Sequence, residues 1–196
     1  MDCTQSLLLQ CHPDTACTAV SSIKAVVRLE GGSTLAATYT IEGAIEQLQI
    51  LGEASNGTEL WRHTCFELFI GATNDAEYYE FNFSPSGEWA VYGFRSYRDG
   101  GPIQVDGLEP KIAVERGADF LQLSAAVPLD RLAGIPSGVS LSLGLSSVVE
   151  DRSGGLSYWA IKHPPGKPDF HHPDNFAVEI QPSLGESRGI EYTAKA

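Results

Sequence analysis

Two glutamates in the middle of the chain are the first candidates for chemistry. Glu67 lies in the segment LWRHTCFELFIG and Glu80 in the segment YYEFNF, and apolar residues alternate around each of them. On neighbouring strands the two carboxylates would share one face about 5 Å apart, which is the separation that retaining glycosidases use. The alternative, which we favour over catalysis, is a structural salt-bridge network with Arg62 or Arg95.

A proline-rich segment carries most of the histidines. We call residues 162–175, KHPPGKPDFHHPDN, the histidine loop; it holds four of the eleven prolines and three of the five histidines. Because proline restricts φ, such a loop is stiff and presents side chains at a low entropic cost. The histidines either bind a ligand, pin the loop by hydrogen bonds to the backbone, or ligate a metal. The H-x₇-H-H spacing of His163, His171 and His172 matches no established metal signature.

Aromatic side chains form the third group of candidates. Their rings stack on the apolar C–H faces of sugars, while carboxylates, amides and guanidinium groups bind the hydroxyls. We therefore predict a site for a small polar ligand in the central segment and the histidine loop, and we expect no catalytic residue. The predicted ligand-binding residues are Trp61, Arg62, His63, Glu67, Glu80, Asn82, Tyr92, Arg95, Trp159, Lys162, His163, His171 and His172.

Three consecutive strands should position the glutamates. Alternation between residues 66 and 94 predicts that one face of these strands belongs to the core, and that the other face, with both glutamates, is a ligand platform or a buried polar network. We further expect His163 and one of His171 and His172 to reach Glu67, Glu80 or Arg62, in a cleft capped by the histidine loop. The predicted core face consists of Phe66, Leu68, Ile70, Tyr79, Phe81, Phe83, Ala90, Tyr92 and Phe94.

The rest of the chain also reads as short strands separated by turns. Hairpins are predicted at 23–30 with 34–42 and at 111–116 with 120–127; further strands are expected at 6–11, 45–51, 139–149, 157–163 and 176–180. Residues 98–111 are expected to be a surface loop, and residues 128–132 one helical turn. Parallel sheets need helical crossovers, which are missing, so the sequence predicts an all-β, two-sheet antiparallel sandwich or jelly roll. We expect one domain over 1–180 and a frayed tail over 181–196.

Composition restricts the partners. The 196 residues have a net charge of −12 and a pI near 4.7, which argues against nucleic acid and anionic membranes and leaves neutral or cationic ligands open. No apolar run approaches the roughly 20 residues of a membrane span. The short apolar run at 7–9 lacks a basic flank, so we expect a cytoplasmic protein with free cysteines, among them a buried Cys65.

Three blocks of the sequence, LWRHTCFELFIG, YYEFNFSPSGEWAVYGFRSYR and YWAIKHPPGKPDFHHPDNF, resemble DOMON-like domains related to family 9 carbohydrate-binding modules, of the bacterial single-domain type. The resemblance runs from about residue 7 to residue 180. It implies a β-sandwich, a non-catalytic role in binding sugars or haem, and a contribution of Glu67 and Glu80 to the site. The methionine that ligates haem in some DOMON domains has no counterpart, and neither has the secretion signal usual for carbohydrate-binding modules.

The expected function is therefore a non-catalytic module for a carbohydrate or a similar small polar ligand, without a cofactor. Three alternatives stay open: a haem-binding domain with His63, His163, His171 or His172 as ligands, a protein–protein interaction domain, and a glycoside hydrolase that uses Glu67 and Glu80.

Overall fold

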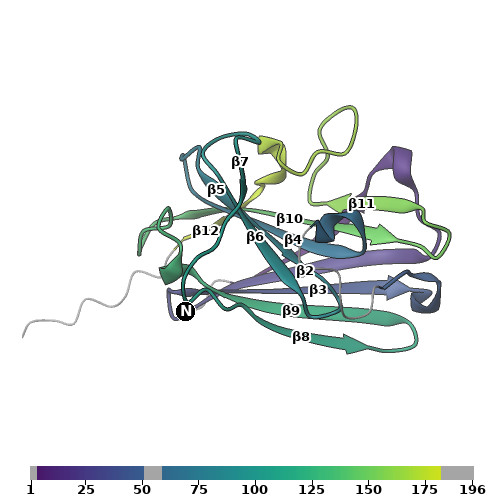
Figure 1. Ribbon diagram of the computed structural model, residues 1–196. Coiled ribbons are helices and arrows are strands. Elements are labelled where there is room, and N and C mark those ends of the chain that lie inside the picture. The colour runs from purple at the N-terminus through teal and green to yellow at the C-terminus, as the bar shows by residue number, and fades with distance from the viewer. Residues whose placement is uncertain (1–3, 51–58, 182–196) are drawn as a thin grey trace, which may run out of the picture.

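The computed structural model describes residues 4–50 and 59–181, and within them the regular structure is mostly antiparallel strands (Figure 1). No helix in these residues is long and apolar enough to cross a membrane. The strands are β1 (Thr4–Cys11), β2 (Val20–Glu30), β3 (Thr34–Gly43), β4 (Cys65–Ala72), β5 (Tyr78–Phe83), β6 (Trp89–Phe94), β7 (Gly100–Pro102), β8 (Lys111–Arg116), β9 (Phe120–Pro128), β10 (Leu141–Glu150), β11 (Leu156–Ala160) and β12 (Val178–Ile180).

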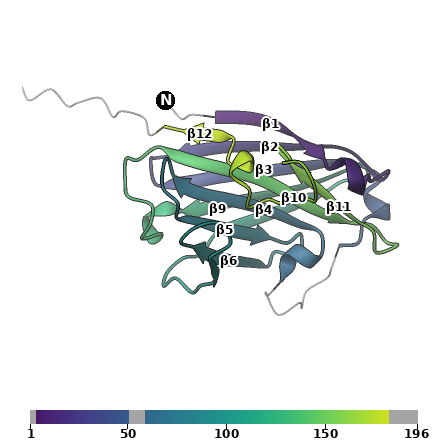
Figure 2. The same ribbon diagram turned by 90° about the horizontal axis from the view of Figure 1, so that it is seen from above.

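Two sheets share the strand β1. The first sheet has the order β1-β2-β3-β9-β8, and the second has the order β7-β6-β5-β4-β10-β11, with β12 also paired to β10. The first part of β1, from Thr4 to Leu9, pairs with β2, whereas Gln10 and Cys11 pair with β11. Figures 1 and 2 show the two layers lying over one another. The predicted all-β antiparallel sandwich is therefore confirmed.

The main core lies between the two sheets. Ile23, Leu35 and Ile41 point into it from the first sheet and are fully buried. Leu68 and Leu145 meet them from the second sheet and are also fully buried. Burying such large aliphatic side chains is the dominant favourable contribution to folding. The strict alternation in these strands thus reflects one face packed on the partner sheet.

Several predicted elements differ in the structure. Residues 45–51 are predicted as a strand, but Ile45–Gln47 form a 3₁₀ turn (η2), and Leu48 makes a single bridge to Asp151. Ile45 and Leu48 are both buried, and their spacing of three suits one 3₁₀ turn better than a strand. The predicted loop 98–111 contains the short strand β7. The helical turn expected at 128–132 is the 3₁₀ turn η4 (Leu129–Arg131).

In β6, the last of the three central strands, the face predicted to point into the core points outward, and the opposite face points into the core. Tyr92 and Phe94 were expected in the core, but Tyr92 lies opposite Glu80, on the face that carries the glutamates. Val91 lies opposite Phe81 and points into the core instead. Both faces of this strand are apolar or aromatic, so alternation alone does not decide which face is inside; the register with β5 decides it.

Three cysteines, Cys11, Cys17 and Cys65, are free thiols, and Cys65 is fully buried, as expected. Burial, with smaller contributions from the charges of Glu67 and Glu80, raises the pKa of the Cys65 thiol well above its usual value. The fourth, Cys3, lies outside the described residues, and so do residues 182–196 of the tail that is predicted to fray over 181–196.

The histidine loop covers the outer face of the second sheet, where it forms a second small core. Phe170 of the loop packs there with Phe69 of β4. The amide of Asn175 donates to the Phe170 carbonyl oxygen at 2.9 Å, which fixes the loop's own backbone. A Cβ atom at Gly144 of β10 would lie 2.9 Å from the Asn175 amide nitrogen. Glycine at this position therefore allows the loop to approach the sheet, so that the loop and strands enclose a space.

Candidate functional site

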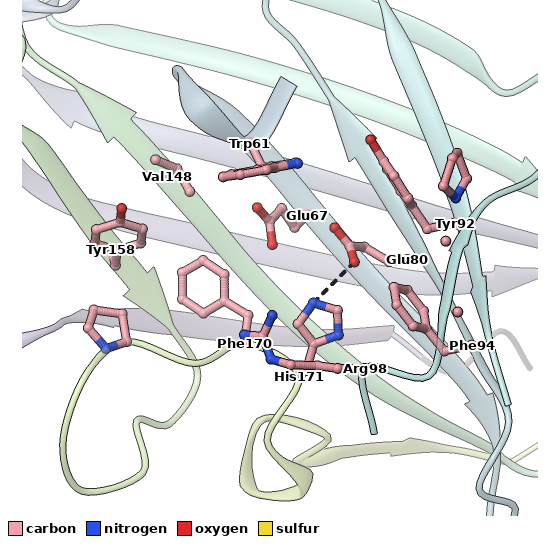
Figure 3. A pocket seen from close by; sticks show the side chains of 14 residues that line it. Trp61, Glu67, Glu80, Tyr92, Phe94, Arg98, Val148, Tyr158, Phe170 and His171 are labelled. Atoms are coloured by element: carbon pink, nitrogen blue, oxygen red, sulfur yellow. Dashed lines mark ion pairs between the residues drawn. The ribbon is translucent and has the colours of Figure 1, made fainter. Parts of the chain in front are cut away.

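The histidine loop and the second sheet enclose a cavity of about 430 Å³, which we call the glutamate cavity (Figure 3). Its lining residues come from six strands, namely β4, β5, β6, β7, β10 and β11. The 3₁₀ turn η3 (Leu60–Arg62), the turn after β6 and the histidine loop supply the others. The side chains labelled in Figure 3 are Trp61, Glu67, Glu80, Tyr92, Phe94, Arg98, Val148, Tyr158, Phe170 and His171.

The floor of the glutamate cavity carries two buried carboxylates. Glu67 on β4 is 3% exposed and Glu80 on β5 is 6% exposed. Glu67 lies directly opposite Asn82, so the two glutamates are diagonal neighbours and not the directly facing pair that catalysis by two close carboxylates would suggest. The amide of Asn82 donates to Glu80 Oε1 at 2.8 Å, and Ser146 flanks Glu67 from β10.

His171 connects the carboxylate floor to the wall of the cavity. Its Nδ1 lies 2.9 Å from the Tyr78 hydroxyl, which accepts a hydrogen bond from the Arg98 backbone N–H at 3.1 Å. When the Tyr78 hydroxyl donates its own proton to Nδ1, the imidazole carries its hydrogen on Nε2. That atom lies 3.4 Å from Glu80 Oε2. The loop thus directs a donor at the carboxylate.

Burial controls the protonation of these groups. Burial, together with the nearby Arg98 charge and against the opposing charge of Asp169, lowers the pKa of His171 to about 4, so the imidazole is neutral at pH 7. Burial also raises the pKa of Glu67 well above its usual value, and the charge of Glu80 adds to this shift. For Glu80, burial raises the pKa, although the Asn82 hydrogen bond and Arg98 oppose the shift. Both carboxyl groups thus hold their protons more tightly than an exposed glutamate.

A clasp closes one end of the cavity. Asp169 of the histidine loop accepts hydrogen bonds from Arg98 Nη2 at 2.7 Å and from the Tyr97 hydroxyl at 2.6 Å. Burial raises the pKa of Asp169, but these two hydrogen bonds, the Arg98 charge and the His171 backbone N–H together outweigh it, so the pKa is below its usual value. The His171 backbone N–H donates to the same carboxylate at 3.2 Å. The clasp therefore holds the loop against the turn that follows β6.

Aromatic rings form the walls. Trp61 stands at the rim with 42% of its surface exposed, and the Arg62 guanidinium lies 5.1 Å from its ring centre. Figure 3 shows Trp61 on one side of the two glutamates and Phe170 with His171 on the other. Tyr92 and Phe94 of β6 line a further side of the space. The result is a polar floor between apolar faces.

The structure brings part of the predicted site together. Trp61, Glu67, Glu80, Tyr92 and His171 line the glutamate cavity, and Asn82 bonds to Glu80 from below. Four other predicted residues form ion pairs elsewhere: Arg62 with Glu59, His63 with Glu150, Arg95 with Asp99, and Lys162 with Asp174. Trp159 packs in the main core. The His172 ring accepts a hydrogen bond from the Asp174 backbone N–H.

The predicted position of His163 is wrong, whereas that of His171 is correct. His163 Nε2 lies 2.8 Å from the Gln10 carbonyl oxygen, and its ring packs edge-on against His12 at 4.9 Å. The reason is that β11 ends at Ala160, three residues earlier than predicted, and the chain then turns toward β1. The three histidines thus face different partners, and the described residues contain no group of three or more ligating side chains that could hold a metal ion.

Several lining residues were not predicted as site candidates, among them Phe94, Arg98, Tyr158 and Phe170. Arg98 and Phe170 reach the cavity from a turn and a loop, where no periodicity reports the direction of a side chain. Tyr158 carried a usable signal, since it alternates with Trp159 on β11. With Trp159 assigned to the core, Tyr158 must point to the face of the glutamates.

Comparisons with known proteins show which fold the chain shares with them. No family model matches the chain, and no curated protein matches it. A suggested carbohydrate-binding protein from Bacteroides uniformis has a similar structure, with a TM-score of 0.62 and 16% identity over 88% of this chain and 83% of that one. This likeness shows a shared fold.

Two further structures are of a family 9 carbohydrate-binding module from Caldicellulosiruptor kristjanssonii. Its complex with cellotriose gives a TM-score of 0.49 and 12% identity over 83% of this chain and 75% of that one. Its complex with glucose gives a TM-score of 0.47 and 13% identity over 78% and 72%.

Proposed function

We propose that this protein is a non-catalytic module that binds a carbohydrate, or a similar small polar ligand, in the glutamate cavity. The observation that carries the proposal is the lining itself, in which buried carboxylates form the floor between aromatic walls. Sugars present hydroxyls around the edge of the ring and apolar C–H groups on its faces. A site with this division of polar and aromatic groups matches both.

The dimensions support a small ligand. A volume of about 430 Å³ lies within the roughly 300–1,000 Å³ that small-molecule sites occupy. Glu67 and Glu80 are acceptors for hydroxyl groups when ionised and donors when protonated, and the Arg98 guanidinium is a donor. Trp61, at the rim, offers an exposed ring for stacking. One or two sugar rings suit this arrangement.

The family resemblance supports the same function. The blocks that surround Glu67, Glu80 and the histidine loop resemble DOMON-like domains related to family 9 modules, and we propose membership of that group. The fold shared with the suggested carbohydrate-binding protein of Bacteroides uniformis agrees with it. We do not extend the proposal to catalysis, because Glu67 and Glu80 are diagonal neighbours and not a directly facing pair. We do not extend it to haem, because both ring nitrogens of His171 face protein groups.

Calorimetric titration of the full chain tests the proposal. The panel contains glucose, galactose, mannose, xylose, their amino and N-acetylamino derivatives, and disaccharides of each. We expect saturable binding of at least one member with one site per chain. An absorption spectrum of the purified protein is recorded in parallel. Absence of binding across the panel contradicts the proposal, and a Soret band would favour the haem-binding alternative.

A further inference from the structure

The glutamate cavity has an unbalanced charge. Arg98 is the one lysine or arginine among its lining residues, and its guanidinium is already held by Asp169 at 2.7 Å. In the described part of the chain, neither Glu67 nor Glu80 forms an ion pair with a lysine or an arginine. The nearest basic group is His171, which is neutral at pH 7. Neither carboxylate is therefore directly paired with a cationic group as its countercharge, although the Arg98 charge acts on both from a distance.

A ligand can supply this countercharge. Burying an ionised carboxylate without a partner is costly, and the carboxyl groups respond by holding protons. A neutral sugar brings no positive charge, so it leaves the buried carboxyl groups unpaired. A ligand with an ammonium group stabilises the ionised form of a carboxylate beside it and also displaces the proton.

The walls and the whole chain favour a cation as well. Cations are attracted to the faces of tryptophan and tyrosine rings, and Trp61 and Tyr92 border the cavity. The net charge of −12 attracts cations toward the protein from solution.

We propose that the glutamate cavity selects amino sugars that carry a free ammonium group, and that the ammonium group lies against the carboxylates of Glu67 and Glu80. This inference rests on the proposed carbohydrate-binding function and narrows it to a class of sugar. The hexose ring then stacks on the aromatic walls, with its remaining hydroxyls toward Arg98 and the rim. Each proton that leaves a carboxyl group on binding passes to the buffer.

Three β-1,4-linked disaccharides test the proposal, because they differ only in the group at C2: an ammonium in the glucosamine disaccharide, an acetamide in its N-acetylated form, and a hydroxyl in cellobiose. The same comparison with galactosamine, N-acetylgalactosamine and galactose covers the other configuration at C4. We expect the ammonium sugars to bind at least about tenfold more tightly, a ratio that corresponds to roughly 1.4 kcal/mol. Calorimetry in buffers of different ionisation enthalpy should show proton release for the ammonium sugars alone.

Three variants identify the source of the preference. Glu67→Gln and Glu80→Gln keep the shape of the floor but remove one charge each, so the preference for the ammonium sugar should fall toward one. Glu115→Gln, which removes an exposed charge from β8, should leave the preference unchanged. Thermal melts establish that each variant is folded before it is titrated.

The outcomes separate the two proposals. Equal or tighter binding of cellobiose, galactose or the N-acetylated sugars overturns the amino-sugar inference and leaves the carbohydrate-binding function intact. A preference for the ammonium sugar that persists in both glutamine variants also overturns it, because the floor charges would then not be its source. If no sugar binds at all, the proposed function fails, and the inference fails with it.

Discussion

The hydroxyl of Tyr39, on β3, donates a hydrogen bond to the main-chain carbonyl oxygen of Glu67, on β4, at 2.7 Å. Tyr39 belongs to the first sheet and is fully buried, and its ring lies 5.1 Å from that of Phe66. The bond therefore runs across the main core to the strand that carries a floor carboxylate of the glutamate cavity. The position of that strand is fixed from the side opposite to the cavity.

Replacing Tyr39 by phenylalanine should lower the free energy of unfolding by about 1–2 kcal/mol, because a buried carbonyl oxygen loses a donor while the ring still fills its place. Urea unfolding measures the effect. Tyr97→Phe is the matched control, since that hydroxyl bonds on the surface, and its effect should be smaller. Equal stability of Tyr39→Phe and the wild type would show that the bond contributes nothing to the packing of the sheets.

His171 should make stability depend on pH. Its pKa is about 4 in the folded protein and near 6.5 in the unfolded chain, so the unfolded chain binds more protons between these values. The free energy of unfolding therefore falls as the pH is lowered through this window, by up to roughly 3 kcal/mol from this group. Glu67 and Glu80, whose pKa values are raised, act in the opposite direction. The comparison must therefore be made against a His171→Gln variant.

The variant should gain stability relative to the wild type as the pH falls from 6.5 to 4.5, measured by urea unfolding at each pH. The groups that face His171 in the wild type, Tyr78, Glu80, Arg98 and Asp169, remain in the variant. His172→Gln removes a half-exposed histidine that caps the following 3₁₀ turn and lies near Asp174, away from the glutamates, and so serves as the control. A stability difference independent of pH would contradict the burial of a neutral imidazole.

The clasp at Asp169 should contribute more to ligand binding than the exposed ion pair between Lys162 and Asp174 in the histidine loop. Asp169→Asn removes the charge that Arg98 and Tyr97 share, so the histidine loop is held less firmly against the cavity. We expect ligand affinity to fall about tenfold, which corresponds to roughly 1.4 kcal/mol of binding free energy. Amide hydrogen exchange should become faster around residues 169–172. Asp174→Asn in the same loop breaks the exposed pair with Lys162 at 3.2 Å and removes the carboxylate 4.0 Å from His172 Nδ1, and it should change either property little.

Trp61 should report on the ligand. Trp61→Ala should weaken sugar binding about tenfold, since an aromatic contact contributes roughly 0.5–1.5 kcal/mol beyond its buried area. Stability should stay within about 0.5 kcal/mol of the wild type, because the side chain is exposed. Trp89 and Trp159 pack on the main core, so a change in tryptophan fluorescence on binding should be lost in Trp61→Phe. Fluorescence changes that survive this substitution would place the ligand elsewhere.

The sequence predicted the strands best where charge and apolar residues alternate. Glu67 and Glu80 mark one face of β4 and β5 without ambiguity, so these faces were correct. The next strand has apolar residues on both faces, and only its pairing with β5 decides that Tyr92 faces the glutamates. His163 and His171 lie in one loop without periodicity. Their directions depend on where β11 ends and on the clasp at Asp169, and neither feature has a signal in the sequence.

The strand β1, by pairing with both sheets, makes them one continuous path that begins at β7 and finishes at β8. Unpaired strand edges invite pairing with the edge of another molecule. The first end is only three residues long and contains Pro102, which has no N–H to donate. The last strand is largely exposed but carries Lys111, Glu115 and Arg116. Both ends of the path are therefore poor templates for self-association, which protects a chain this rich in β-structure from aggregation.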